Sequence, residues 1–165
     1  MGKIRIENNA DFLQITEIHN QAFGDTEESQ IVTDLRKNDN LKLSLVYEND
    51  GILVGHIAYS LIKNNNDIVI GMGLAPLSVL PSYQKKGIGS KLVEYGNHQV
   101  KKMGFNQIFV LGDPKYYSRF GFDKAKKYNY FSDFDLKGNH FMVLGKKTKE
   151  PFKINVYYSN EFKYR

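Results

Sequence analysis

The spacing of apolar residues predicts two short helices at the start of the chain. The first is expected over residues 11–23, with Asp11 as its N-cap, because apolar residues recur there at intervals of three and four. Its inner face carries Phe12, Ile15, Ile18, His19 and Ala22. A loop over residues 24–29 precedes the second helix, whose apolar positions are Ile31, Val32 and Leu35.

The next part of the chain has the alternating pattern of a β-meander. Apolar and polar residues alternate over residues 41–48, and the Asn49-Asp50-Gly51 sequence that follows is a strong hairpin signal. Residues 52–62 return as a second strand, and a turn at residues 64–67 leads into a third strand over residues 68–80. We therefore expect an antiparallel sheet at the centre of the fold.

The third strand is irregular where Pro76 interrupts it. Proline has no N–H to donate to a neighbouring strand, so the pattern predicts a bulge or splay over residues 75–77. A splayed strand would leave the backbone groups of Leu77 and Val79 unpaired. An extended ligand that carries amide groups could bind there as an additional strand would.

Two glycines mark a strand-to-helix turn directly after this strand. Without Cβ atoms, Gly87 and Gly89 allow a sharp turn and the close approach of a ligand to the backbone. The first N–H groups of the following helix have no partner within it, and with the helix dipole they favour phosphate or pyrophosphate. The residues expected to present these groups and nearby positive charge are Lys85, Lys86, Gly87, Ile88, Gly89, Ser90 and Lys91.

The amphipathic helix after the turn is expected to end at Gly104, just past two lysines. Its apolar face carries Ile88, Leu92, Val93, Val100 and Met103. An apolar run over residues 107–111 then predicts a buried parallel strand. A short helix is expected over residues 115–120, and further strands over residues 141–145 and 154–158.

Composition narrows the range of functions. The chain has 165 residues and no cysteine, which excludes disulfides, thiolate metal sites and a cysteine nucleophile. The histidines, at His19, His56, His98 and His140, have no close ligand spacing, so no metal site is expected. No apolar run approaches membrane-spanning length, and no signal-peptide pattern is present, so we expect a cytoplasmic protein without membrane contacts.

Charge is distributed unevenly along the chain. Residues 1–80 carry 6 Lys and Arg against 11 Asp and Glu, giving −5, whereas residues 81–165 carry 17 against 7, giving +10. Attraction of a polyanionic cofactor to the basic half explains this asymmetry. Basic and aromatic residues interleave over residues 124–131, but a solvated face with buried rings explains that pattern with fewer assumptions than a nucleic-acid partner does.

The glycine-rich turn does not fit two common phosphate-binding fingerprints. A dinucleotide fingerprint would need glycine at Leu92, and a P-loop would need Lys-Ser where this chain has Ser90-Lys91. The Q-x-x-G-x-G sequence from Gln84 to Gly89 instead resembles the acetyl-CoA signature of the GNAT superfamily of N-acetyltransferases. One amphipathic helix and one strand separate this motif from a second motif that is similar to the same superfamily.

The second likeness to this superfamily is a tyrosine followed, after three residues, by Gly-Phe. Tyr117 and Gly121-Phe122 have this spacing. The sequence motif L-G-D-P-x-Y-Y-x-R-F-G-F over residues 111–122 resembles that of a bacterial subgroup of predicted acetyltransferases. Together the two motifs make residues 41–122 similar to the family. One departure is that many members have an asparagine ahead of the tyrosine, where this chain has Asp113-Pro114.

The resemblance implies an α/β (α+β) fold in which residues 1–165 form one acetyltransferase domain. Its sheet would be mixed, mostly antiparallel and flanked by helices, with acetyl-CoA in a V-shaped splay between adjacent strands. Leu77 and Val79 would then bond the pantetheine arm through their backbone, and Lys85, Lys86, Gly87, Ile88, Gly89 and Ser90 would hold the pyrophosphate. Tyr117 would point at the thioester sulfur as the general acid for the CoA thiolate.

The implied reaction is direct attack of a primary amine on the acetyl group, followed by protonation of the leaving thiolate. Transfer from a tyrosine with a pKa near 10 to a thiolate whose thiol has a pKa near 8.5 is mildly uphill. The amine must lose a proton as well, and the sequence leaves Glu27, Glu28, His56 or water as the base. The acceptor is also open, with polyamines, aminoglycosides and lysine side chains as candidates.

Two alternatives concern the role and assembly of the chain. A GNAT-like module could bind acyl-CoA for sensing or protein interaction without turnover, although Tyr117 favours an enzyme. Residues 125–165 match no family pattern. Their strands are expected either to complete the chain's own sheet or to pair across a homodimer.

Overall fold

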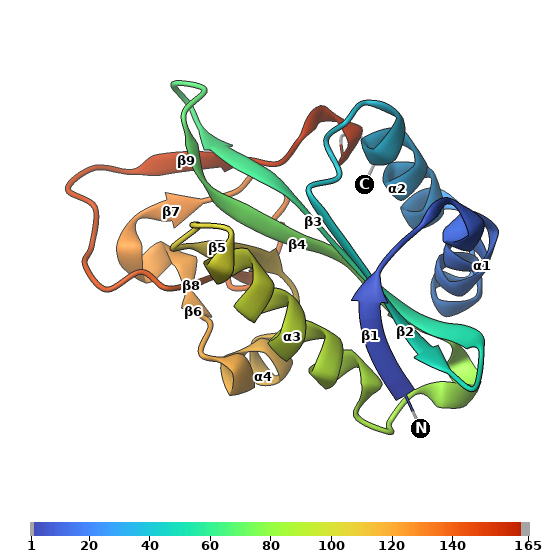
Figure 1. Cartoon of the computed structure of the whole chain (residues 1–165). Helices are drawn as coiled ribbons and strands as arrows, with labels where there is room; N and C mark the ends of the chain where they lie inside the picture. Colours follow the sequence, from blue (N-terminus) through green and yellow to red (C-terminus); the bar gives the residue numbers. More distant parts are fainter. Residues whose placement is uncertain (1, 163–165) are drawn as a thin grey trace.

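The structure is a computed structural model that describes residues 2–162 (Figure 1). The strands are β1 Gly2–Ile6, β2 Leu43–Asn49, β3 Ile52–Asn64, β4 Val69–Val79, β5 Ile108–Leu111, β6 Asp123–Lys124, β7 Tyr130–Phe131, β8 Phe141–Leu144 and β9 Ile154–Tyr157. The α-helices are α1 Phe12–Phe23, α2 Glu27–Lys37, α3 Ile88–Lys102 and α4 Pro114–Tyr117. Short 3₁₀ turns lie at Asn9–Asp11, Pro81–Tyr83, Ser118–Phe120, Ala125–Tyr128 and Asn160–Phe162. Over this described range, no helix is long and apolar enough to cross a membrane.

The strands form a mixed sheet in the order β1-β2-β3-β4-β5-β8-β6, and β9 adds to the end of β3 with β7 as its other neighbour. The paired strands are antiparallel, except that β4 is parallel to β5 and β7 is parallel to β9. Parallel neighbours need a crossover, which α3 supplies between β4 and β5. The expected mixed, mostly antiparallel sheet is confirmed.

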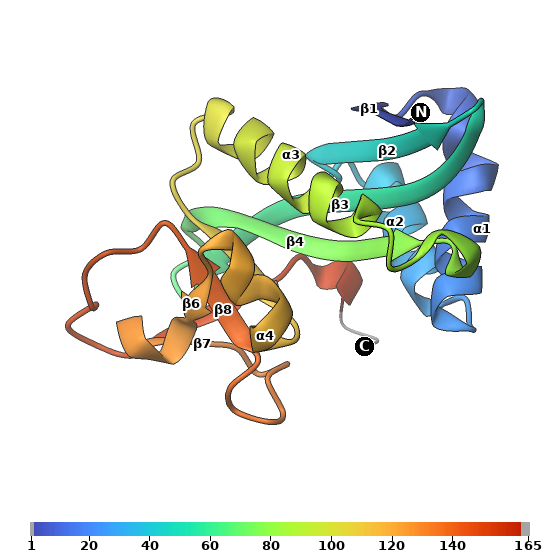
Figure 2. The ribbon, with the colours of Figure 1, turned by 90° about the horizontal axis from the view of Figure 1, so that it is seen from below.

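Helices cover both faces of this sheet, with α3 on one face and α1 and α2 on the other (Figure 2). The core under α3 includes Leu45, Val79, Ile88, Leu92 and Val93. The core under α1 and α2 contains Ile15, Ile18, Val32, Val46 and Leu53. Successive residues of a strand point to opposite faces, which is why Leu45 and Val46 enter different cores.

Two local features predicted in the meander are present. Asp50 and Gly51 have φ values of 52° and 80°, as a tight hairpin turn between β2 and β3 requires. On the other side of β3, Ile57 pairs with Leu77 of β4, and the next pair is Tyr59 with Leu74. The register therefore shifts between these two pairs. Two residues of β4, including Pro76, therefore oppose one residue of β3, which confirms the expected bulge.

The structure differs from the sequence-based expectations at two helix residues. Asp11 occupies the N-cap position of α1, but its side chain makes no capping hydrogen bond, and its carboxylate accepts two hydrogen bonds from the Arg5 guanidinium at 2.7 and 3.0 Å. The side chain of Asn8 caps the preceding 3₁₀ turn instead. Met103, expected on the packed face, is the C-cap residue of α3 and is 46% exposed.

The strands of the C-terminal part find partners within the chain. β8 lies between β5 and β6, and β9 pairs with the end of β3. This outcome favours completion of the chain's own sheet by β8 and β9. A further core, called here the C-terminal core, forms there around Phe109, which contacts the rings of Tyr130 and Phe141 at centroid distances of 5.3 and 5.5 Å.

Candidate functional site

The sheet opens between β4 and β5 because the two strands pair over only two positions. Met72 pairs with Ile108 and Gly73 with Phe109, whereas β4 continues along β3 to Val79. The bulge around Pro76 lies directly beyond the last pair. The expected V-shaped splay between adjacent strands is therefore confirmed, and a long edge of β4 faces the opening.

The backbone of Leu77 and Val79 is directed toward this opening. The N–H of Leu80 donates to the carbonyl of Val54 on β3 at 2.8 Å. Backbone groups alternate in direction along a strand, so the preceding odd-numbered residues face away from β3. The Val79 carbonyl accepts a hydrogen bond from the side-chain amide of Gln84 at 2.9 Å, which ties the following turn to the strand.

A cavity of about 470 Å³, called here the β4 groove, follows this edge to the start of α3. Its lining includes most of the residues predicted to bind the cofactor, namely Leu77, Val79, Lys85, Gly87, Ile88, Gly89 and Ser90. Lys86 is the exception, since its ammonium group lies over the Tyr83 ring, 5.4 Å from the ring centroid. The groove thus joins a strand edge to a helix N-terminus.

The turn at the start of α3 has the geometry that its glycines allow. Lys85 and Gly87 have φ values of 62° and 83°, and Gly87 occupies the N-cap position of α3. Gly89 has a different role, because a Cβ atom there would lie 3.1 Å from the Tyr116 hydroxyl oxygen. Glycine at this position keeps the groove open between α3 and α4.

Sequence reasoning missed four further residues that line the groove, namely Ser78, Tyr83, Tyr116 and Arg119. The Arg119 guanidinium lies 4.6 Å from the centroid of the Tyr116 ring and donates a hydrogen bond to Ser90 Oγ at 3.1 Å. It adds a cation to the side of the groove opposite Lys85. Spacing predicts only that Arg119 shares a face with Tyr116, because residues three apart on a helical turn are neighbours, and it does not predict the contact with α3.

Tyr117 lines a second cavity of about 220 Å³, called here the Tyr117 cavity, which meets the β4 groove at Leu77. The Tyr117 ring packs edge-on against Tyr116 and Phe122, at centroid distances of 5.0 and 5.7 Å. A Cβ atom at Gly112 would collide with this ring. Burial, with a smaller effect of Tyr116, raises the pKa of Tyr117 well above its usual value.

The three side chains predicted as candidate bases lie outside the lining of both cavities, as far as the described residues go. Glu27 and Glu28 belong to the first turn of α2 and, with Asp25, bring carboxylate oxygens within 4.8 Å of one another. His56 is fully buried, and both of its ring nitrogens are hydrogen-bonded to other side chains.

Comparison with known proteins identifies a class of protein that agrees with the geometry of the site. The family described as "Acetyltransferase (GNAT) domain" matches residues 40–124. The chain is 35% identical over 122 residues to the uncharacterized N-acetyltransferase YjhQ of Escherichia coli K12, covering 72% of this chain and 67% of that protein. It is 34% identical over 123 residues to the uncharacterized N-acetyltransferase YhbS of the same strain, covering 74% of each.

Two solved structures extend the similarity over nearly the whole chain. A GNAT family acetyltransferase from Brucella melitensis in complex with acetyl-CoA has a TM-score of 0.83 and 34% identity, covering 98% of both chains. YhbS from Escherichia coli in complex with CoA has a TM-score of 0.88 and 27% identity, covering 98% of this chain and 92% of that one.

A splayed strand edge that leads to a glycine-rich helix start, beside a buried tyrosine, defines a GNAT-type acetyltransferase site. The chain belongs to the GNAT family. This membership confirms the class expected from the two sequence motifs, an N-acetyltransferase that uses acetyl-CoA.

Proposed function

We propose that this chain, as one domain over residues 1–165, transfers an acetyl group from acetyl-CoA to a primary amine by direct attack. The observation that carries the proposal is the meeting of the β4 groove and the Tyr117 cavity at Leu77. One cavity then holds the cofactor and the other receives the amine. The reaction occurs where they join.

The β4 groove fits the chemistry of CoA along its length. The outward-facing backbone of Leu77 and Val79 suits the amides of a pantetheine arm, as an added strand would. At the other end, the N–H groups of Gly87 to Ser90 and the cations of Lys85 and Arg119 suit a pyrophosphate. Lys86 is proposed to add to the positive field around the turn. Acetyl-CoA and CoA in the two similar structures support this assignment.

Bound acetyl-CoA supplies an activated acetyl thioester, which a neutral amine attacks without a covalent enzyme intermediate. The Leu77 N–H is proposed to donate to the carbonyl oxygen as that atom gains negative charge. Tyr117 donates its phenolic hydrogen toward the departing sulfur. Its raised pKa keeps the phenol protonated at neutral pH, but makes complete transfer of the proton to sulfur less favourable than from an exposed tyrosine.

The acceptor is proposed to be a cationic amine. Phe23, at the end of α1, lines the Tyr117 cavity, and the next turn of chain carries Asp25, Glu27 and Glu28. Carboxylates this close along the chain to a residue of the cavity would raise the local concentration of cations. Spermidine, kanamycin and a peptide with one internal lysine represent the classes of amine that this environment favours.

The test is release of CoA thiol from acetyl-CoA in the presence of each of these amines, with mass spectrometry of the amine. Thiol release that depends on the amine, together with an acetylated product, supports the proposed enzyme. Tight binding of acetyl-CoA without release, for all three amines and for a broader amine pool, would instead favour a non-catalytic acyl-CoA sensor or interaction module of the same fold.

A further inference from the structure

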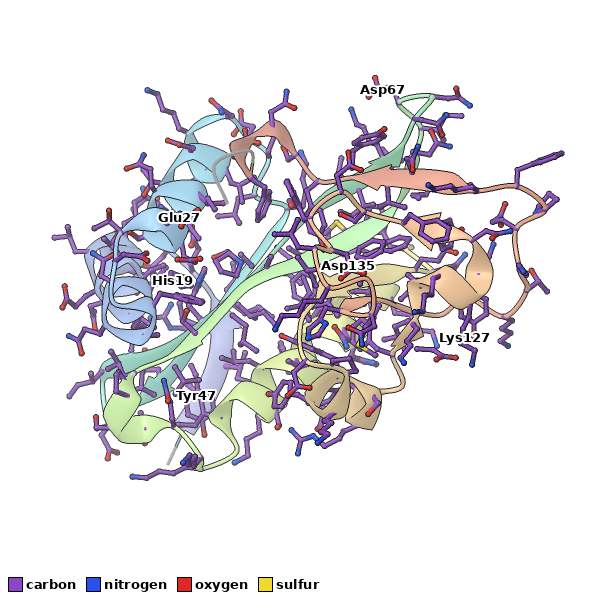
Figure 3. All side chains as sticks on the ribbon, turned by 180° about the vertical axis from the view of Figure 1, so that it is seen from behind. His19, Glu27, Tyr47, Asp67, Lys127 and Asp135 are labelled. Carbon is purple, nitrogen blue, oxygen red and sulfur yellow. The ribbon has the colours of Figure 1, made fainter. Side chains whose placement is uncertain are left out.

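A series of buried, hydrogen-bonded side chains, called here the relay, runs from β4 over β3 to β2 on the face of the sheet beneath α1. Hydrogen bonds join Ser78 Oγ to His19 Nδ1 at 2.6 Å and His19 Nε2 to His56 Nδ1 at 2.7 Å. His56 Nε2 is then 2.7 Å from Ser44 Oγ, which donates to Glu7 Oε1 at 2.5 Å. Both imidazoles are fully buried, and Ser44 and Ser78 nearly so. Figure 3 shows His19 on the inward side of α1.

The carboxylate at one end fixes the direction of these hydrogen bonds. Glu7 forms a two-pronged ion pair with Arg36, at 2.9 Å for both hydrogen bonds, so it can only accept. Ser44 must therefore donate its one proton to Glu7. Ser44 then accepts from His56, which places the His56 proton on Nε2.

The same reasoning continues through the two imidazoles to Ser78. Burial, His56 and Arg36 lower the pKa of His19, while burial and Arg36 lower that of His56 to about 3, so both rings are neutral. A neutral His56 protonated on Nε2 accepts at Nδ1, so His19 also carries its proton on Nε2. Ser78 then donates to His19 Nδ1. Every donor in the relay points toward Glu7.

The two ends of the relay lie in different environments. At the inner end, Ser78 lines the β4 groove beside Leu77, where the two cavities meet. The ring of His19 also stacks on Phe23, which lines the Tyr117 cavity, at a centroid distance of 6.4 Å. At the outer end, the side chain of Glu7 is 11% exposed, which gives it access to solvent. The relay thus connects the proposed reaction site with the surface.

The charges that face the relay come from three elements. Arg36 on α2 pairs with Glu7, and its guanidinium covers the Phe12 ring at 3.8 Å. Asp11, in the turn before α1, acts electrostatically on His56 and is itself paired with Arg5 of β1. Glu7 and Asp11 each have an arginine partner, so the charges around His19 and His56 are balanced and the two imidazoles need not be protonated.

We propose that Ser78 accepts the proton that the acceptor amine must lose and that the relay passes it to Glu7. The N–H bond of the amine breaks, its electron pair stays on nitrogen for attack, and a new O–H bond forms on Ser78. The original Ser78 proton moves to His19, and one proton moves on at each step through His56 and Ser44 until Glu7 is protonated. This inference rests on the proposed function and names a path for the proton that the amine must lose.

The first test compares Ser78→Ala with Ser78→Thr, which keeps the hydroxyl group. Ser60→Ala is the matched control, because Ser60 is a fully buried serine on β3 outside the relay. The readout is kcat/KM for the most active of the three amines, at saturating acetyl-CoA, from pH 6.5 to 10. At pH 7 only about one molecule in a thousand of an amine with a pKa near 10 is neutral.

Without Ser78 as proton acceptor, the enzyme could use only the amine molecules that are already neutral in solution. We expect Ser78→Ala to lower kcat/KM about 100-fold at pH 7, a typical effect of a general base. The loss should shrink steadily toward the pKa of the amine. Ser78→Thr should recover most of the activity, and Ser60→Ala should match the wild type. A loss that is equal at every pH, or no loss, overturns the relay.

The second test determines which ring nitrogens of His19 and His56 carry a proton in the wild-type protein. Nitrogen-15 chemical shifts of His19 and His56 should show two neutral rings, each protonated on Nε2, and a His19 proton on Nδ1 would overturn the relay. Glu7→Gln, which replaces the carboxylate by an amide that cannot take up the proton, should lower kcat/KM at pH 7 as Ser78→Ala does, with unchanged acetyl-CoA affinity as the check on folding. Wild-type activity in this variant would also overturn the relay.

The proposed function and the relay fail in distinguishable ways. Thiol release by the wild type that Ser78→Ala leaves unchanged at every pH overturns the relay alone. Absence of amine-dependent thiol release by the wild type overturns the proposed function, and the catalytic role of Ser78 with it.

Discussion

Replacing Tyr117 by phenylalanine isolates the role of one hydroxyl group. The variant keeps the ring contacts with Tyr116 and Phe122, and none of the hydrogen bonds seen between described residues involves the Tyr117 hydroxyl. The folded state should therefore lose little stability. A hydrogen bond to a charged group contributes about 1.5–3 kcal/mol, so losing it as charge develops on sulfur should lower kcat by one to two orders of magnitude.

The assay is steady-state release of CoA thiol at saturating amine, with the affinity for acetyl-CoA measured separately by calorimetry. Tyr130→Phe is the matched control, because this buried tyrosine lies in the C-terminal core, donates a hydrogen bond to Gln107 and lines neither cavity. We expect Tyr117→Phe to lower kcat with little change in affinity, and the control to leave both unchanged. Turnover by Tyr117→Phe at the wild-type rate would remove Tyr117 from the mechanism.

Three further variants test separate parts of the structure. Gly112→Ala should displace the Tyr117 ring and lower kcat at least about tenfold with acetyl-CoA affinity maintained, and a wild-type kcat would show that the ring position is unimportant. Glu27→Gln, measured by the same thiol release, should change kcat less than about twofold if this carboxylate is not the base. Burial would raise the pKa of Glu161, but hydrogen bonds from Ser159, Asn38 and Asn40 outweigh it and lower the pKa from 4.5 to about 2. This group therefore stabilises the fold above pH 4.5, by up to about 3 kcal/mol, and loses that contribution as the pH falls through 2. Urea unfolding should show Glu161→Gln to be less stable than the wild type at pH 7, with the difference vanishing near pH 2, and a difference that does not depend on pH would contradict this account.

The central sheet could be predicted because its signals are local. Alternation along β2 and β3, the turn at Asp50-Gly51 and the interruption at Pro76 each depend on neighbouring residues. The two-residue strands β6 and β7 have no such signal, since two residues are too few to show a period. The pairing of β9 with β3 joins segments about 90 positions apart, and only the packed core selects it.

The same distinction applies to the candidate site. The groove residues were predicted because Leu77 to Ser90 form one continuous segment whose turn chemistry can be read from its glycines. Arg119 was missed because its bond to Ser90 depends on how the 3₁₀ turn Ser118–Phe120 packs against α3. His19 was correctly expected on the inner face of α1, but its partner Ser78 lies 59 positions away and cannot be found by spacing.

Asp11 shows how tertiary contacts override a local preference. Its place before an apolar helical pattern is typical of an N-cap, and a cap contributes about 1 kcal/mol. In the structure, Asp11 instead forms a charged pair with Arg5, which also bonds Glu48 on the neighbouring strand. Hydrogen bonds between charged groups are stronger than the neutral cap that Asn8 can supply in its place.

The measurement that tests the account most directly is calorimetric titration of the wild-type protein and of Gly89→Val with acetyl-CoA. Larger side chains at Gly89 would fill the space between α3 and the Tyr116 hydroxyl, in the centre of the β4 groove. The account predicts saturable binding to the wild type and affinity at least about tenfold lower for the variant, as loss of close backbone approach to the anion implies. Absence of binding to the wild type, or equal affinity of the two proteins, would contradict the assignment of this groove to acetyl-CoA.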